Sequence, residues 1–155
     1  MLEDREVTWF PSYGGEMRGG TANCAVIISD ELIASPIVTN PDILVVMNDA
    51  SLQKFQPRLK QKGILIFDSS LIKNPVLRND VDVLGVPATE ISSAIGYTKS
   101  ANMVLVGVLI AKTRLFEETM VFEAIENSIT QGKKSIEMNR MAIRKGMRFF
   151  EDKKD

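Results

Sequence analysis

Two uninterrupted runs of apolar residues most constrain the fold of this chain. They span residues 43–47 and 64–67, and each is bounded by turn-forming residues. Such a run predicts a strand that is buried on both faces, as in a parallel sheet covered by helices. Residues 81–86 form a third expected strand. We therefore expect an α/β fold, a three-layer α/β/α sandwich with a largely parallel, mixed central sheet.

Helical patterns follow these strands along the chain. Asn48 or Asp49 can cap a helix over residues 50–60, which Gly63 ends. Thr89 is expected to cap a short helix that Gly96 ends. The segment 100–112 is apolar nearly all round, which predicts a helix in the interior. The expected later helices are 89–95, 100–112, one beginning at 117, and 133–150.

The N-terminal part of the chain is expected to contain two further strands. The first spans residues 6–10 and ends at Pro11, and the second spans residues 23–29. Residues 32–34 are expected to return as a hairpin partner. Cys24, in the second of these strands, is expected to be a buried strand residue rather than a nucleophile, because free cysteine is usually buried.

Length and charge limit the organisation of the chain and its partners. At 155 residues the chain is expected to form one domain, 1–155, with a sheet-containing part, 1–112, and C-terminal helices, 113–155. The net charge of -1 gives no overall attraction for nucleic acid or an anionic membrane. The longest apolar run is too short for a bilayer, and no signal peptide is recognisable. A cytoplasmic location is expected.

The rarest residue types exclude several kinds of chemistry. The chain has no histidine, the commonest general base and metal ligand, and one cysteine, Cys24. It cannot by itself hold a four-cysteine iron–sulfur cluster. We therefore assign neither catalytic residues nor a metal site. Residues 133–155 carry a local excess of four positive charges, which indicates either a solvated helix face or contact with an acidic partner or phosphates.

A glycine-rich loop, residues 11–23, is the strongest functional candidate. Its paired glycines can bring backbone amides close to an anion, and Arg18 can add a charge-assisted hydrogen bond. The spacing fits neither Gly-x-Gly-x-x-Gly nor a P-loop, so an internally bonded loop and a subunit interface stay open. The candidate binding residues are Tyr13, Gly14, Glu16, Arg18, Gly19, Gly20, Thr21 and Asn23.

The loop and its flanking strands, residues 7–24, closely resemble the signature of one family. This family is the gamma subunits of 2-oxoacid:ferredoxin oxidoreductases, particularly the 2-oxoglutarate branch. The likeness covers most of residues 6–112, whereas the C-terminal helices resemble the family only in pattern. It continues in the expected order through residues 26–31, 35–38, 41–44, 51–55, 68–72, 86–91 and 101–104.

The resemblance implies an enzyme of alpha, beta, gamma and delta subunits, or a fused equivalent, from anaerobic or microaerobic microbes. Such an enzyme decarboxylates a 2-oxoacid oxidatively, passes electrons to ferredoxin and forms an acyl-coenzyme A. Thiamine diphosphate and the iron–sulfur clusters are implied on the partner subunits. The isolated gamma chain is then expected to be inactive.

The resemblance leaves two functions for the glycine loop: binding coenzyme A, or contacting partner subunits only. In the second case the chain is a non-catalytic scaffolding or binding domain. A stand-alone nucleotide-binding α/β domain is a third alternative, against which the missing glycine fingerprint argues. Family members usually begin earlier, with a strand, a glycine-rich turn and a helix. This chain is therefore expected to lack the family's first βα unit.

Overall fold

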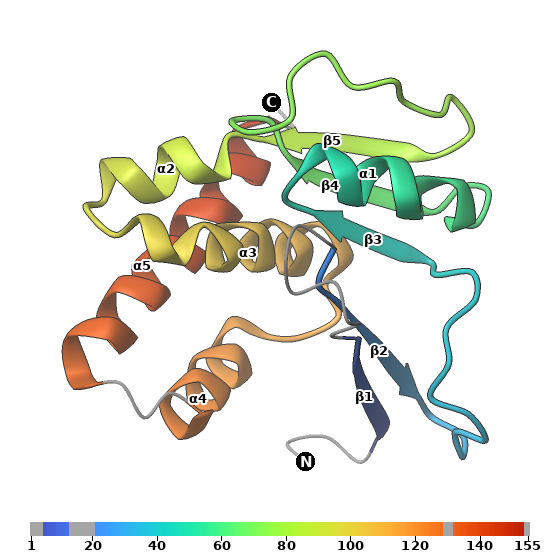
Figure 1. The fold of residues 1–155 in the computed structure, drawn as a ribbon. Coiled ribbons are helices and arrows are strands. Elements are labelled where there is room, and N and C mark those ends of the chain that lie inside the picture. Colours follow the sequence, from blue (N-terminus) through green and yellow to red (C-terminus); the bar gives the residue numbers. More distant parts are fainter. Residues whose placement is uncertain (1–4, 13–20, 129–131, 154–155) are drawn as a thin grey trace.

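A three-stranded parallel sheet organises the fold (Figure 1). The computed structural model describes residues 5–12, 21–128 and 132–153. The central strand β4 pairs with β3 on one side and β5 on the other, both in parallel. The three strands are β3 (Ile43–Val46), β4 (Ile64–Asp68) and β5 (Asp82–Val86). All three agree with the strands that the apolar runs predict, to within a residue or two at either end.

Helices cover both faces of this sheet. Alternate residues of β4 point to opposite faces. Leu65 and Phe67 pack in one cluster with Leu52 of the helix α1 (Asp49–Phe55). Ile66 faces the other side and packs in a second cluster with α3. Two covered faces make three layers, as the sequence predicts. The helices are α1, the 3-10 turn η1 (Gln56–Arg58), α2 (Ala88–Ala94), η2 (Thr98–Ser100), α3 (Ala101–Thr113), α4 (Glu118–Ser128) and α5 (Gly132–Asp152).

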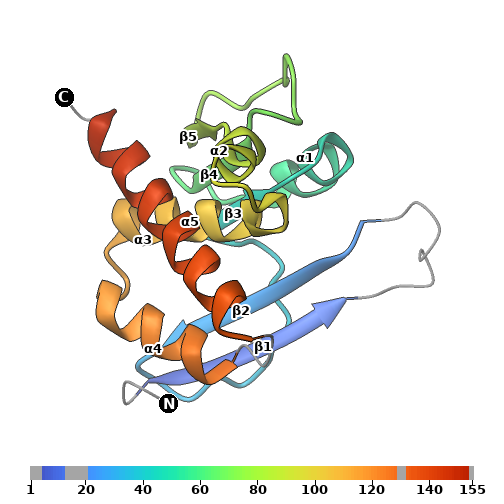
Figure 2. The same ribbon diagram turned by 90° about the vertical axis from the view of Figure 1, so that its left-hand side faces the viewer.

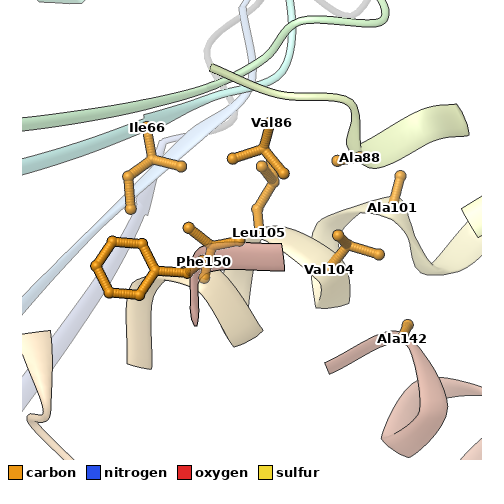
Figure 3. Packing of buried hydrophobic residues seen from close by; sticks show 9 residues of the cluster. Ile66, Val86, Ala88, Ala101, Val104, Leu105, Ala142 and Phe150 are labelled. Carbon is orange, nitrogen blue, oxygen red and sulfur yellow. The ribbon is translucent and has the colours of Figure 1, made fainter. Parts of the chain in front are cut away.

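Helix α3 lies between the sheet and α5, which explains its almost entirely apolar sequence. Figure 3 shows Ile66 and Val86 of the sheet above Leu105 of α3, with Phe150 of α5 beside it. Figure 2 shows α5 crossing α3. Ile143 of α5 packs in a third cluster with Phe122 and Ile125 of α4. The prediction of an interior helix over residues 100–112 is confirmed.

Three local predictions are wrong for identifiable reasons. Thr89 does not cap α2, because Pro87 holds the N-cap position and the Thr89 hydroxyl donates to Asp68 instead. The helix expected over 50–60 ends at Phe55 and continues only as the 3-10 turn η1, which contains a proline in its first turn. Residues 32–34 form no strand, and the Leu32 side chain is exposed.

The first two strands form a separate antiparallel hairpin, β1 (Glu6–Ser12) and β2 (Asn23–Ser29). Pro11 does not end β1; it pairs with Cys24. Proline is tolerated because each strand of a two-stranded ribbon has a free edge, where a missing N–H breaks no ladder bond. Cys24 lies in the predicted strand but is exposed, so its predicted burial is wrong. In both views the hairpin lies apart from the three-stranded sheet (Figures 1 and 2).

Candidate functional site

The hairpin holds both ends of the glycine-rich loop. The pairing of β1 with β2 runs without interruption from Glu6 opposite Ser29 to Ser12 opposite Asn23. Opposite residues of an antiparallel pair have Cα atoms about 5 Å apart. The segment between Ser12 and Asn23 is therefore a hairpin loop whose two ends are fixed close together. The sequence predicts the flanking strands but not that they pair with each other across the loop.

A lysine from another element reaches the exit of this loop. Lys54 Nζ donates a hydrogen bond of 2.9 Å to Thr21 Oγ1. Lys54 lies in the last turn of α1, where a cation also complements the helix dipole. The Lys54 ammonium lies 5.5 Å from the centroid of the Phe55 ring. A positive charge and a hydroxyl group therefore stand together where the chain leaves the loop.

The capping of α1 fixes the position of this lysine. Asn48 occupies the N-cap position with an extended backbone, and its Oδ1 accepts a hydrogen bond of 2.8 Å from the Ser51 amide. Leu52 of the same helix is buried against the sheet. The helix that carries Lys54 is thus anchored at its start by a cap and along its inner face by packing.

Two of the predicted binding residues lie in the described part of the structure. Thr21 contacts Lys54, and Asn23 begins β2 opposite Ser12. Sequence reasoning missed Lys54 as a neighbour of the loop, because no local pattern links two residues so far apart in the chain. The other predicted binding residues lie outside the described residues: Tyr13, Gly14, Glu16, Arg18, Gly19 and Gly20.

A buried carboxyl group joins the loops at the carboxyl end of the parallel sheet. Asp68, the last residue of β4, is fully buried. Its Oδ1 accepts 2.9 Å from the Ser70 amide, and its Oδ2 accepts 2.5 Å from the Thr89 hydroxyl and 3.2 Å from the Thr89 amide. Ser70 Oγ in turn accepts 3.1 Å from the Glu90 amide. These bonds build the sheet edge at which open α/β sheets commonly bind ligands.

An arginine holds the long connection between β4 and β5. Arg78 donates to both carboxyl oxygens of Asp80, at 2.8 and 2.5 Å, and to the carbonyl oxygens of Gln56 and Leu59. The hydrogen bond from Arg78 is the main cause that lowers the pKa of the Asp80 carboxyl group below its usual value. The Arg78 guanidinium thereby ties this connection to the turn that follows α1.

The basic residues of α5 are partly used in packing. Arg140 pairs with Glu126 of α4, and Arg144 pairs with Glu118 at 3.0 Å. Both guanidinium groups also lie over the Phe122 ring. Within residues 5–12, 21–128 and 132–153, no three or more His, Cys, Asp or Glu side chains gather into a group that could hold a metal ion. In the same part of the chain, no helix has the length and apolar character needed to span a bilayer.

Comparison with protein families identifies the kind of chain to which this site belongs. The family described as pyruvate ferredoxin/flavodoxin oxidoreductase matches residues 1–149. The chain belongs to this family. The prediction drawn from residues 7–24 is therefore confirmed at the level of the family.

Two of the similar curated proteins are named as subunits of 2-oxoacid oxidoreductases. Ketoisovalerate oxidoreductase subunit VorA of Methanothermobacter thermautotrophicus is 39% identical over 146 residues, 93% of this chain and 30% of that protein. 2-Oxoglutarate synthase subunit KorC of Methanothermobacter marburgensis is 38% identical over 141 residues, 87% of this chain and 75% of KorC. The chain thus spans less than a third of the VorA subunit and three quarters of KorC.

Solved structures show the same fold. The gamma subunit of a keto/oxoacid ferredoxin oxidoreductase from Geobacter sulfurreducens has a TM-score of 0.80 at 24% identity, covering 96% of this chain and 82% of that one. The 2-oxoglutarate:ferredoxin oxidoreductase of Magnetococcus marinus, solved with 2-oxoglutarate, coenzyme A and succinyl-CoA, also has a TM-score of 0.80, at 19% identity, covering 96% of this chain and 26% of that one. The α/β architecture is therefore that of these oxidoreductase domains.

Proposed function

We propose that residues 1–155 act as a single domain, the gamma subunit of a cytoplasmic 2-oxoacid:ferredoxin oxidoreductase. The assembled enzyme, with alpha, beta and delta subunits, converts a 2-oxoacid and coenzyme A into an acyl-coenzyme A and CO₂ and passes two electrons to ferredoxin. The observation that carries this proposal is the family match over residues 1–149, together with 38% identity to KorC across 75% of KorC.

The proposed substrate is 2-oxoglutarate. Relatives named for ketoisovalerate and for 2-oxoglutarate have nearly equal identity to this chain, 39% and 38%. The 2-oxoglutarate assignment is supported by four relatives named as 2-oxoglutarate synthase subunit KorC, which are 31–38% identical to this chain. Substrate selection itself is assigned to the partner subunits.

Within the assembly, the glycine loop is proposed to contact coenzyme A. The residues at its described end fit a phosphate-bearing ligand, because the Lys54 ammonium and the Thr21 hydroxyl lie 2.9 Å apart and both can donate to phosphate oxygens. Arg18 and the loop glycines would supply the other contacts. The chain's single cysteine does not fit an iron–sulfur cluster, which takes four cysteines. Thiamine diphosphate and the clusters are accordingly assigned to the partner chains.

The test is co-expression of this chain with the alpha, beta and delta subunits. Dye reduction that requires both coenzyme A and a 2-oxoacid supports the proposed function, and 2-oxoglutarate is expected to exceed ketoisovalerate as substrate. Assembly without any 2-oxoacid-dependent reduction would contradict it.

Variants of the loop region separate coenzyme A binding from scaffolding. Loss of one charged phosphate contact in Lys54→Ala or Arg18→Ala is expected to raise the KM for coenzyme A by about tenfold with assembly unchanged. Lys99→Ala is the matched control, since Lys99 is an exposed lysine of the 3-10 turn η2. A loop that only contacts subunits predicts the reverse: weakened assembly with an unchanged KM. Hydrogen exchange of the complex gives a second readout, because bound coenzyme A should protect residues 12–23.

A further inference from the structure

The end of α1 that carries Lys54 needs support from other parts of the fold. Helix α1 is seven residues long and passes after Phe55 into η1. The last carbonyl groups of any helix have no N–H partner within the helix, and Pro57 in η1 has no N–H to donate. A helix shorter than about 12 residues is also marginal without packing against the rest of the protein. The position of Lys54 therefore depends on hydrogen bonds from other elements.

Arg78, in the connection between β4 and β5, supplies this support. Its Nη1 donates a hydrogen bond of 3.1 Å to the carbonyl oxygen of Gln56 and one of 2.6 Å to that of Leu59. Its Nε and Nη2 donate to the two carboxyl oxygens of Asp80, which fixes the plane of the guanidinium group. A cation at this end also complements the helix dipole. One side chain thus caps the carbonyl groups that follow α1.

The side chain of Gln56 bonds back to the same connection. Its Nε2 donates 3.0 Å to the carbonyl oxygen of Val76, and its Oε1 accepts 3.2 Å from the Arg78 amide. Gln56 is the C-cap residue of α1 and follows closely after Lys54. Four hydrogen bonds therefore join residues 76–78 to residues 56–59. Because the donors lie on both sides, neither segment can shift alone without breaking bonds.

We propose that Arg78 is a positioning residue for coenzyme A binding and acts through Lys54. This inference rests on the proposed function, in which Lys54 contacts coenzyme A. Asn48 and Leu52 hold the start and the inner face of α1, and Arg78 holds its end. The Lys54 ammonium is thereby kept 2.9 Å from the Thr21 hydroxyl at the exit of the glycine loop. A misplacement of about 1 Å in a ligand-contacting group can weaken its interaction by a large factor.

The experiment is a double-mutant cycle on the complex assembled with alpha, beta and delta subunits. Arg78→Ala is expected to raise the KM for coenzyme A by about two- to tenfold with kcat little changed, because the lost contact serves binding. In a Lys54→Ala background the same substitution should leave the KM where Lys54→Ala alone puts it, since the group through which Arg78 acts is gone. Arg58→Ala is the matched control, an exposed arginine of η1, and should not change the KM.

A second variant and a second readout guard against loss of folding. Gln56→Ala removes the side-chain bonds to residues 76 and 78 but leaves Arg78 in place. It should raise the KM for coenzyme A in the same direction, by about twofold or more. Circular dichroism of each full-length variant confirms folding. Hydrogen exchange of the free chain should be faster around residues 53–59 and Thr21 in Arg78→Ala, and unchanged there in Arg58→Ala.

The outcomes separate this inference from the proposed function. A KM that Arg78→Ala raises equally with Lys54 present or replaced overturns the inference, because independent effects on the KM multiply. An unchanged KM in folded complexes of both Arg78→Ala and Gln56→Ala also overturns it. Either result leaves the coenzyme A-dependent activity, and with it the proposed function, standing. An assembled complex without coenzyme A-dependent reduction contradicts the proposed function and the inference together.

Discussion

Gly146 of α5 lies so close to Val104 of α3 that a Cβ atom on Gly146 would overlap the Val104 carbonyl oxygen. The contact is reciprocal, because a Cβ atom on Gly107 of α3 would overlap the carbonyl oxygen of Ile143 in α5. The two helices therefore meet backbone to backbone, and neither position has room for a side chain. This crossing brings Ala142 and Phe150 of α5 onto the core of the sheet.

Replacing either glycine by alanine should destabilise the protein. Alanine gains up to about 1 kcal/mol in helix propensity, but separating two packed backbones costs about 1–3 kcal/mol or more. We expect Gly146→Ala and Gly107→Ala each to lower the thermal midpoint by several degrees. Lys145→Ala, at an exposed neighbouring position, should change it little. A Gly146→Ala chain as stable as the unaltered one would show that the helices do not meet as described.

The Thr89 hydroxyl should matter more to stability than a surface hydroxyl. It donates 2.5 Å to the fully buried Asp68 carboxyl group, so Thr89→Val leaves a buried acceptor with one donor fewer. The expected loss is about 1.5–3 kcal/mol in the free energy of unfolding, measured by urea denaturation. Thr89→Ser keeps the hydroxyl and should recover most of it. A Thr89→Val chain as stable as the unaltered one would contradict this role of the hydrogen bond, because valine keeps the methyl group and lacks only the hydroxyl.

Acid should weaken the connection that Arg78 holds. The hydrogen bond from Arg78 lowers the pKa of Asp80 in the folded chain relative to the unfolded one. A depressed folded pKa contributes stability that is present above the unfolded pKa, near pH 4, and is lost as the pH falls through the folded pKa. Between about pH 5 and pH 3 the urea midpoint should therefore fall less in Asp80→Asn than in the unaltered chain. Parallel pH profiles would contradict this role of the pair.

The cap of α1 should contribute measurably to stability. Asn48 Oδ1 accepts from the Ser51 amide at 2.8 Å, and removing such a cap by Asn48→Ala costs about 1 kcal/mol. Asn48→Asp retains an acceptor and should restore most of the stability in thermal unfolding. Because α1 carries Lys54, the alanine variant should also expose the Lys54–Thr21 contact to faster hydrogen exchange around Thr21. If Asn48→Ala leaves hydrogen exchange around Thr21 unchanged, the packing of Leu52 alone fixes the position of the helix.

The central sheet could be predicted from sequence because its signal is local. Residues 65–67 of the central strand β4 are buried on both faces, which requires an apolar side chain at each position. The edge strand β3 has the same apolar composition, but its Val45 side chain stays 39% exposed. Helix α3 could be predicted for the same reason, since it is covered by the sheet on one side and α5 on the other. In each case the apolar pattern that predicts the element lies within the element's own sequence.

Features that depend on distant partners could not be predicted in this way. Threonine is a residue type that commonly caps helix N-termini, but the Thr89 hydroxyl donates a hydrogen bond to Asp68, which is distant in sequence. Cys24 has the sequence context of a buried strand, but its strand belongs to a ribbon with an open face. Lys54 reaches Thr21 only because the fold brings α1 beside the hairpin loop. The assignment of loop residues 13–20 to a binding site stays a prediction.

The position of α5 in the chain has a consequence for biosynthesis. Helix α3, with Val104, Leu105 and Val108 fully buried, is translated before α5, the helix that covers its outer side. A nascent chain in which α3 has left the ribosome and α5 has not therefore displays a long apolar helix to the surrounding solution. The core can close only when translation has passed residue 150. Chaperone recognition of the growing chain should accordingly peak while residues 101–113 are exposed and end when the last helix emerges.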